Sequence, residues 1–188
     1  MTSSSEDQAP PGGLVFSSSH RLLSADDVSR AIRRMAHEVV ERNGGVEGVV
    51  IVGLQRGGSL LARVLADTLG EISGQNIPNA LLDVSFYRDD LEVRPLPDAA
   101  STTLDRDLTG QTVILVDDVL YTGRTIRAAL NALADWGRPH SVQLAVLVDR
   151  GHRELPIRPD FVGKNLPSSR DETVVATLDG VWIGTVTK

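Results

Sequence analysis

One segment constrains the fold of this chain more than any other: an apolar run that ends in two adjacent aspartates and continues into a helix. Residues 112–116 read Thr-Val-Ile-Leu-Val, which is typical of a strand buried on both faces. Asp117 and Asp118 follow, then a loop of small and hydroxyl residues, and a helical pattern covers 125–136. A strand that passes through a polar loop into a helix is the repeating unit of parallel α/β sheets.

Apolar strands and amphipathic helices alternate along much of the remaining chain. Further strands are predicted at 48–53, 80–84 and 141–148, and further helices at 24–43 and 59–70. This alternation predicts an α/β fold with a mostly parallel sheet.

The two ends of the chain differ from this middle part. Residues 1–19 are rich in Ser, Pro and Gly and show no periodicity, so a disordered N-terminal tail is expected there. Beyond Asp149, Gly and Pro separate shorter segments, and small strands are expected at 174–178 and 181–183. Residues 20–188 are then a single domain, long enough to have its own core.

The composition argues against several classes of protein. Hydrophobic residues make up 41% of the chain and charged residues 23%, which argues against wholesale disorder. No apolar stretch approaches the roughly 20 residues that a membrane span needs. Without cysteine the chain forms no disulfide or zinc–thiolate site, which is compatible with the cytoplasm. The net charge of −6 argues against a general polyanion binder, although a local basic face could exist.

The loop after the paired aspartates is suited to a phosphate. Ligands of open α/β sheets bind at the carboxyl ends of strands, where Asp117 and Asp118 are expected. Backbone N–H groups of the loop and the start of the next helix can cradle a phosphate, and Gly123 permits close approach of the backbone. Two carboxylates would repel the phosphate unless they face vicinal hydroxyls or help to hold a divalent cation. The segment therefore fits a ribose 5-phosphate; the alternative is an ordinary buried strand followed by an acidic turn.

This segment resembles the phosphoribosyl-pyrophosphate (PRPP) motif of type I phosphoribosyltransferases. The resemblance implies their α/β fold, with a central, mainly parallel five-stranded sheet flanked by helices and a small hood formed by the chain ends. Catalytic roles are implied for Arg56, Arg88, Asp117 and Asp118. The residues implied in binding PRPP or a nucleotide are Gln55, Arg56, Tyr87, Arg88, Asp89, Asp117, Asp118, Val119, Leu120, Tyr121, Thr122, Gly123, Arg124 and Thr125.

A finer resemblance covers almost the whole chain after residue 20. The segments that carry it are Ala36 to Glu38, Glu41 to Asn43, Tyr87 to Leu91, the paired aspartates with Tyr121, Gly137 to Pro139, Gln143 to Arg158 and Gly163 to Pro167. They are similar to the family of bifunctional pyrimidine operon regulators and uracil phosphoribosyltransferases (PyrR). The resemblance implies conversion of uracil and PRPP to UMP and diphosphate, with Mg²⁺ bound mainly through PRPP and no metal site of the protein's own. It also implies binding to the mRNA leader of pyrimidine genes under the control of UMP or UTP.

The same resemblance implies a base-binding and an RNA-binding set of residues. Phe161 and Val162 are similar to the base-binding hood, although core packing explains Phe161 equally well. RNA contacts are implied in two locally basic segments, at Arg33, Arg34, His37, Arg42, His152, Arg153, Arg158 and Lys164. If these segments adjoin in the fold, they form one basic face on an acidic protein. Without the resemblance, Arg33 and Arg34 would be interpreted as a solvated helix face.

Three alternatives remain open at this stage. The first is a uracil salvage enzyme with no role in RNA binding. The second is a regulator with a vestigial catalytic site, which is suggested by Gln55, where the family usually has Thr, and by the short segment 91–110. The third, a purine-specific transferase, is weaker. A homodimer or a higher homo-oligomer is expected, because symmetric assembly is common.

Overall fold

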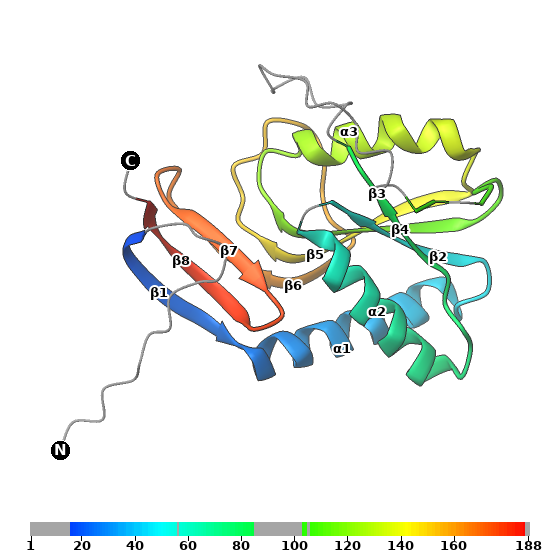
Figure 1. Cartoon of the computed structure of the whole chain (residues 1–188), viewed down its shortest axis with the longest axis horizontal. Coiled ribbons are helices and arrows are strands. Elements are labelled where there is room, and N and C mark those ends of the chain that lie inside the picture. The colour runs from blue at the N-terminus through cyan, green and yellow to red at the C-terminus, as the bar shows by residue number, and fades with distance from the viewer. Residues whose placement is uncertain (1–15, 56, 85–102, 105, 187–188) are drawn as a thin grey trace.

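The computed structural model describes residues 16–55, 57–84, 103–104 and 106–186, which form two sheets and three main helices (Figure 1). The central sheet has five strands in the order β3-β2-β4-β5-β6, and every neighbouring pair is parallel. Its strands are β2 (Val49–Leu54), β3 (Asn79–Leu82), β4 (Thr112–Leu120), β5 (Ser141–Asp149) and β6 (Phe161–Asn165). The expected α/β fold with a parallel five-stranded sheet is confirmed.

Helices cover both faces of this sheet (Figure 1). Helices α1 (Ala25–Asn43) and α2 (Gly58–Ser73) pack on one face, and α3 (Arg124–Leu133), which continues into a short 3₁₀ turn at Ala134–Trp136, packs on the other. Strand β4 shows how the sheet separates two cores. Its Ile114 side chain belongs to the core under α1 and α2, whereas Leu115 belongs to the core under α3. Both faces of the sheet are apolar because both are covered.

A capping box fixes the start of α1. The Ser24 hydroxyl accepts a hydrogen bond from the Asp27 backbone N–H, while the Asp27 carboxylate accepts from the Ser24 backbone N–H at 2.9 Å. The hydrogen bonds from Ser24 lower the pKa of Asp27 from 3.8 to about 2.

We expect this carboxylate to contribute to stability in a defined range of pH. Because the pKa of Asp27 is lower in the folded state, its contribution is complete above the ordinary value of 3.8 and disappears as the pH falls to about 2. Asp27→Asn should therefore lower the free energy of urea unfolding at pH 6, and the difference from wild type should close below pH 2. Asp26→Asn, which leaves the capping box intact, is the control; an equal loss in both variants would contradict the prediction.

A second, smaller sheet is built from both ends of the chain. Strands β1 (Phe16–Ser24), β8 (Gly180–Val186) and β7 (Thr173–Thr177) are antiparallel neighbours in that order, and they lie to one side of the central sheet (Figure 1). Residues 16–19, which the sequence assigns to a disordered tail, are thus part of β1. Their partners lie at the opposite end of the sequence, as in Ser18 opposite Thr185, and local periodicity does not reveal such a pairing. None of the described helices is long and apolar enough to cross a membrane.

Candidate functional site

The paired aspartates lie at the carboxyl end of β4, in the middle of the central sheet. Asp117 is buried and Asp118 is half-buried. The backbone N–H of Asp118 donates to the Asp117 carboxylate at 3.0 Å, and the N–H of Val119 donates to the Asp118 carboxylate at 2.7 Å. These bonds hold the two carboxylates in place at the edge of the sheet where ligands of this fold class bind.

Burial raises the pKa of Asp118, although hydrogen bonds from backbone N–H groups oppose the effect. The raised pKa means that the folded state binds a proton more tightly than the unfolded state. Stability is therefore lost as the pH rises from the ordinary value of 3.8 through the raised pKa.

Asp118→Asn should for this reason increase the free energy of unfolding at pH 7, because the neutral amide keeps an acceptor for Val119 and avoids the cost of a partly desolvated charge. The gain should shrink as the pH falls below 3.8, where the wild-type carboxyl is protonated in both states. Urea unfolding of the ligand-free protein between pH 3 and 8 measures this gain in the free energy of unfolding. A variant that is less stable than wild type at pH 7 would contradict the prediction.

The loop after β2 packs directly against the paired aspartates. A Cβ atom added to Gly57 would overlap the Asp118 carboxylate, and one added to Gly58 would overlap the carbonyl oxygen of Val116. The backbone N–H of Gln55 donates to the Leu82 carbonyl at 3.1 Å. The structure therefore brings the segment that contains Gln55 to the aspartates. Four predicted site residues, Arg56, Tyr87, Arg88 and Asp89, lie outside the described residues.

The loop after β4 surrounds a cavity of about 350 Å³. Gly123 has a positive φ of 92°, which favours glycine, and helix α3 begins at the next residue. Residues that line the cavity include the predicted Asp117, Val119, Leu120, Tyr121, Thr122, Gly123, Arg124 and Thr125. We call residues 121–125 the phosphate loop, after the role that the sequence predicts for them. Its glycine, its hydroxyls and the start of α3 form the expected arrangement around one hollow.

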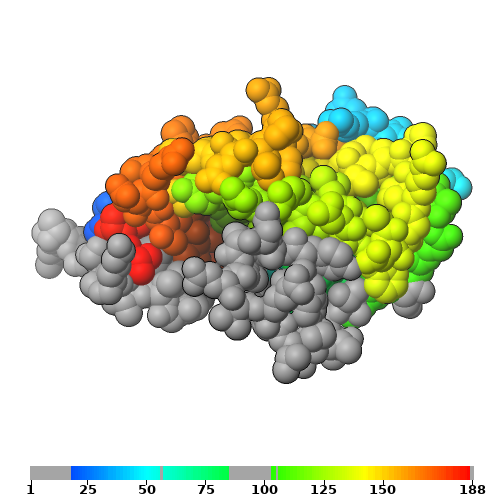
Figure 2. All heavy atoms as spheres, turned by 90° about the horizontal axis from the view of Figure 1, so that it is seen from above, coloured from blue at the N-terminus to red at the C-terminus, as the bar shows by residue number. Residues whose placement is uncertain are grey.

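Glu154 is a residue of this cavity that the sequence did not single out. Its backbone N–H donates to the Thr122 carbonyl at 3.0 Å, and its carboxylate accepts from the Arg124 Nε at 2.8 Å. Arg124 is therefore part of the cavity wall and not an isolated surface charge. Figure 2 shows the segment after β5, in orange-yellow, beside the green atoms of the segment after β4. Only the fold brings Glu154 to a loop some 30 residues earlier in the chain.

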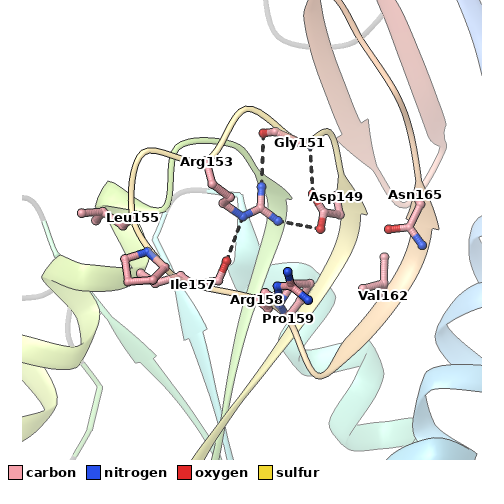
Figure 3. Close-up of a pocket in the computed structure, with 10 residues that line it drawn as sticks. Asp149, Gly151, Arg153, Leu155, Ile157, Arg158, Pro159, Val162 and Asn165 are labelled. Atoms are coloured by element: carbon pink, nitrogen blue, oxygen red, sulfur yellow. Dashed lines mark hydrogen bonds and ion pairs between the residues drawn. The ribbon is translucent and has the colours of Figure 1, made fainter.

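A larger cavity, of about 830 Å³, lies at the carboxyl ends of β5 and β6 (Figure 3). Val162 lines this cavity, but the Phe161 side chain does not. Phe161 is buried in the core under α1, with the Arg42 guanidinium carbon 5.7 Å from its ring centroid. Successive residues of a strand point to opposite faces of the sheet, so the two neighbours cannot share one role. Core packing is the interpretation of Phe161 that the structure supports.

Helix α1 lies beside β6, so the two basic segments adjoin. Arg34 donates to the backbone carbonyls of Val162 at 2.9 Å and Gly163 at 2.7 Å, and Arg42 pairs with Asp160 at 2.8 Å. The members of the predicted RNA-binding set that are exposed are Arg33, Arg34, His37, Arg42, Arg158 and Lys164. The other two, His152 and Arg153, are half-buried and bonded to neighbouring loops.

Tyr121, at the start of the phosphate loop, is held by two residues of the segment after β5. The Arg150 guanidinium carbon lies 4.3 Å from the Tyr121 ring centroid, and the His152 ring meets it edge-on at 5.9 Å. His152 has a positive φ of 60°, which is uncommon for a residue other than glycine, and its Nε2 lies 2.5 Å from the Ser168 carbonyl. The phosphate loop is thereby packed against the C-terminal part of the chain.

Comparison with known proteins agrees with this geometry. Residues 18–178 match the model of the phosphoribosyl transferase domain family. Among solved structures, the hypoxanthine phosphoribosyltransferase of Trypanosoma cruzi aligns with a TM-score of 0.68 at 19% identity, covering 89% of this chain and 97% of that one. A hypoxanthine phosphoribosyltransferase of Staphylococcus aureus aligns with a TM-score of 0.63 at 18% identity, covering 89% and 92%. These likenesses show the type I phosphoribosyltransferase fold.

Relatives that are similar in sequence are more specific. The bifunctional protein PyrR of Roseiflexus sp. is 56% identical over 171 residues, which cover 87% of this chain and 93% of the relative. The bifunctional protein PyrR of Thermus aquaticus is 53% identical over 161 residues, covering 85% and 89%. Such identity over nearly the whole length of both chains, together with the paired aspartates and the phosphate loop at one sheet edge, places this protein in the PyrR family of phosphoribosyltransferases.

Proposed function

We propose that this protein converts uracil and PRPP to UMP and diphosphate in the cytoplasm, and that it binds the mRNA leader of pyrimidine genes when UMP or UTP occupies the same site. One observation carries the proposal: the segment 153–157 lines both the phosphate-loop cavity and the larger cavity, and Asp118 lies against the loop after β2. A nucleotide needs such an arrangement, in which a phosphate site, a ribose site and a base site lie side by side in that order.

The phosphate and ribose sites have groups of the required chemistry. Backbone N–H groups of residues 122–125 would donate to the 5-phosphate, and the Thr122 and Thr125 hydroxyls would add donors. Asp117 and Asp118 would accept hydrogen bonds from the ribose 2′- and 3′-hydroxyls, directly or through water. Because both carboxylates are fixed by backbone N–H groups, they need little reorganisation when PRPP binds.

The same carboxylates fit a Mg²⁺ ion that arrives with PRPP. Mg²⁺ prefers oxygen ligands and keeps several waters. Because Mg²⁺ loses its waters reluctantly, PRPP oxygens and water would supply most of its ligands beside the two aspartates. When bound, the ion would neutralise charge that develops on the diphosphate.

Uracil would lie in the larger cavity, against the Val162 side chain. In the reaction the bond from C1 of the ribose to the diphosphate oxygen breaks, a bond from C1 to N1 of uracil forms, and the N1 proton passes to the departing diphosphate or to water. The ribose is cationic in the transition state, so positioning and charge stabilisation carry the catalysis. Arg56 and Arg88 are proposed to hold the diphosphate.

Base competition separates uracil from purine chemistry. The solved structures named above are hypoxanthine enzymes, but at 18–19% identity they establish the fold alone. We expect UMP to form from uracil and PRPP, and no IMP to form from hypoxanthine under the same conditions. Formation of IMP alone would favour the purine transferase, and no product from either base would favour the regulator with a vestigial site.

RNA binding is proposed for the exposed basic residues on α1 and β6. Because phosphate contacts dominate the affinity for RNA, neutralising such a residue should weaken binding and reduce its dependence on salt. Arg33 and Lys164 are the best choices for substitution, since both are exposed, whereas Arg34 also holds two carbonyls of β6.

The test is a filter-binding titration with the leader RNA of the pyrimidine genes, with and without UMP. We expect UMP to tighten binding, because a ligand shifts a protein toward the state that it binds better. The double variant Arg33→Ala with Lys164→Ala should bind RNA less tightly at saturating UMP, whereas Arg106→Ala, on the α3 side of the sheet, should not. Absence of RNA binding by the wild type, with or without UMP, would leave the salvage enzyme as the function.

A further inference from the structure

Arg153 is one of the two members of the predicted RNA-binding set, with His152, that are half-buried. Its side chain is only 20% exposed, and each of its three guanidinium nitrogens donates to protein oxygens (Figure 3). These partners lie in three different segments of the chain. Such a residue has little capacity left for a phosphate of an RNA backbone.

One set of contacts reaches the phosphate loop. Arg153 Nη1 donates to the Tyr121 carbonyl at 2.8 Å and lies 3.4 Å from the Leu120 carbonyl. The peptide unit is planar and trans, so fixing the Tyr121 carbonyl also fixes the Thr122 N–H, which points the opposite way. Thr122 lines the phosphate cavity. Arg153 thus sets the orientation of a peptide group in the phosphate site from behind.

The other set of contacts reaches the wall of the larger cavity. Arg153 Nη2 lies 2.5 Å from the Asp149 carboxylate, and its Nε donates to the Ile157 carbonyl at 3.0 Å. Asp149 and Ile157 both line the larger cavity, and Arg153, which holds them, lies in the same wall. One guanidinium group therefore connects the phosphate site with the proposed base site.

We infer that Arg153 is a positioning residue, which holds the phosphate loop and the wall of the larger cavity in the geometry that binds PRPP and UMP. The inference rests on the proposed function, and it assigns Arg153 an effect on RNA only through the nucleotide site. Arginine suits this role because its planar fork can hold several acceptors in fixed directions. A lysine ammonium on a flexible stem cannot hold the same acceptors at once.

The experiment compares Arg153→Met and Arg153→Lys with wild type. Arg170→Met is the matched control, because it removes an exposed arginine of the neighbouring loop. Calorimetry would give the Kd for PRPP with Mg²⁺ and for UMP, at a temperature where thermal melts show every variant to be fully folded. Steady-state kinetics would separate KM for PRPP from kcat, and filter binding would give RNA affinity at UMP concentrations that saturate each variant.

We expect Arg153→Met to raise the Kd for PRPP and UMP by about tenfold or more, as the loss of a charge-assisted hydrogen bond implies. KM for PRPP should rise more than kcat falls, and Arg153→Lys should resemble Arg153→Met. At saturating UMP, neither variant should lose more RNA affinity than Arg170→Met. A purely structural role would lower the melting temperature and leave the Kd of the folded protein unchanged.

Three results with the variants would overturn the inference, and one result with the wild type would do so as well. An unchanged Kd for PRPP and UMP in Arg153→Met would exclude a positioning role. Wild-type values of Kd in Arg153→Lys would mean that the positive charge alone, and not the arginine fork, determines nucleotide binding. Loss of RNA affinity at saturating UMP, beyond that of the control, would make Arg153 a direct RNA contact. If the wild type binds PRPP but not RNA, the proposed regulatory function fails, while the PRPP data still decide the role of Arg153. A wild type that binds neither PRPP nor UMP would overturn the inference together with the proposed activity.

Discussion

Replacing Gly58 by alanine is expected to destabilise the protein by about 3 kcal/mol, near the upper end of what overpacking usually costs. A Cβ atom at this position would overlap the Val116 carbonyl oxygen, 2.9 Å from the carbonyl carbon and 3.1 Å from the Asp117 Cα. All of these are backbone atoms of β4, which has a parallel partner on each side, so no side-chain rotation can relieve the overlap. The first turn of α2 must move away from the sheet instead.

Urea unfolding measures this loss, and Gly70→Ala is the matched control in the same helix. A Cβ atom on Gly70 meets only the Gln75 carbonyl oxygen, at 3.1 Å, and the gain of about 1 kcal/mol in helix propensity offsets that crowding. The control should therefore lie close to wild type. Because the shift begins beside Asp117, Gly58→Ala should also bind PRPP more weakly under conditions where it remains folded. Equal stability of the two variants would contradict the close approach of α2 to β4.

Replacing Arg150 by alanine is expected to lower the free energy of unfolding by about 3 kcal/mol as well. The substitution removes a buried charged donor, so its acceptors lose their hydrogen bonds. Arg150 is only 7% exposed. Its guanidinium donates to the carbonyls of Ser169 at 2.7 Å and Glu172 at 2.8 Å and to the Ser168 hydroxyl at 3.0 Å, while its plane covers the Tyr121 ring. The substitution removes these bonds and the packing of the phosphate loop against the segment before β7.

A double-mutant cycle of Arg150→Ala with Tyr121→Leu would isolate the contact between the guanidinium and the ring. We expect a coupling of about 1–2 kcal/mol, since this arginine is largely desolvated. Arg138→Ala, at an exposed position, is the control and should change the free energy of unfolding by no more than about 0.5 kcal/mol. A loss of less than about 1 kcal/mol in Arg150→Ala would mean that the carbonyls find other donors.

Much of the fold and the centre of the site could be predicted from local sequence. The apolar run of β4, the paired aspartates and the phosphate loop are contiguous, so one short segment specifies a strand, a ligand edge and a helix start. The face of a strand or helix that is buried follows from periodicities of 2 and 3.6 residues, which are local properties. The family resemblance extended the prediction of the fold to the whole domain.

The sequence placed other features less well, since they depend on partners far along the chain. Phe161 and Val162 belong to β6, an edge strand of the central sheet, and the pleat directs one into the core and the other toward the larger cavity. Glu154 enters the phosphate cavity through its contacts with Thr122 and Arg124. No sequence pattern within a few residues of these positions encodes the contacts that they make with distant segments.

The local amino-acid sequence thus determined that this chain would present two carboxylates and a phosphate loop at the edge of a parallel sheet. Tertiary structure alone decided which arginines face solvent and which are internal. Arg33 and Arg153 are the same residue type in equally basic segments, yet Arg33 is exposed on α1 while Arg153 is bonded to carbonyls of the loop after β4. The physical reason is that a guanidinium group is turned inward only where the fold brings enough acceptors within reach, and those acceptors come from distant segments of the chain.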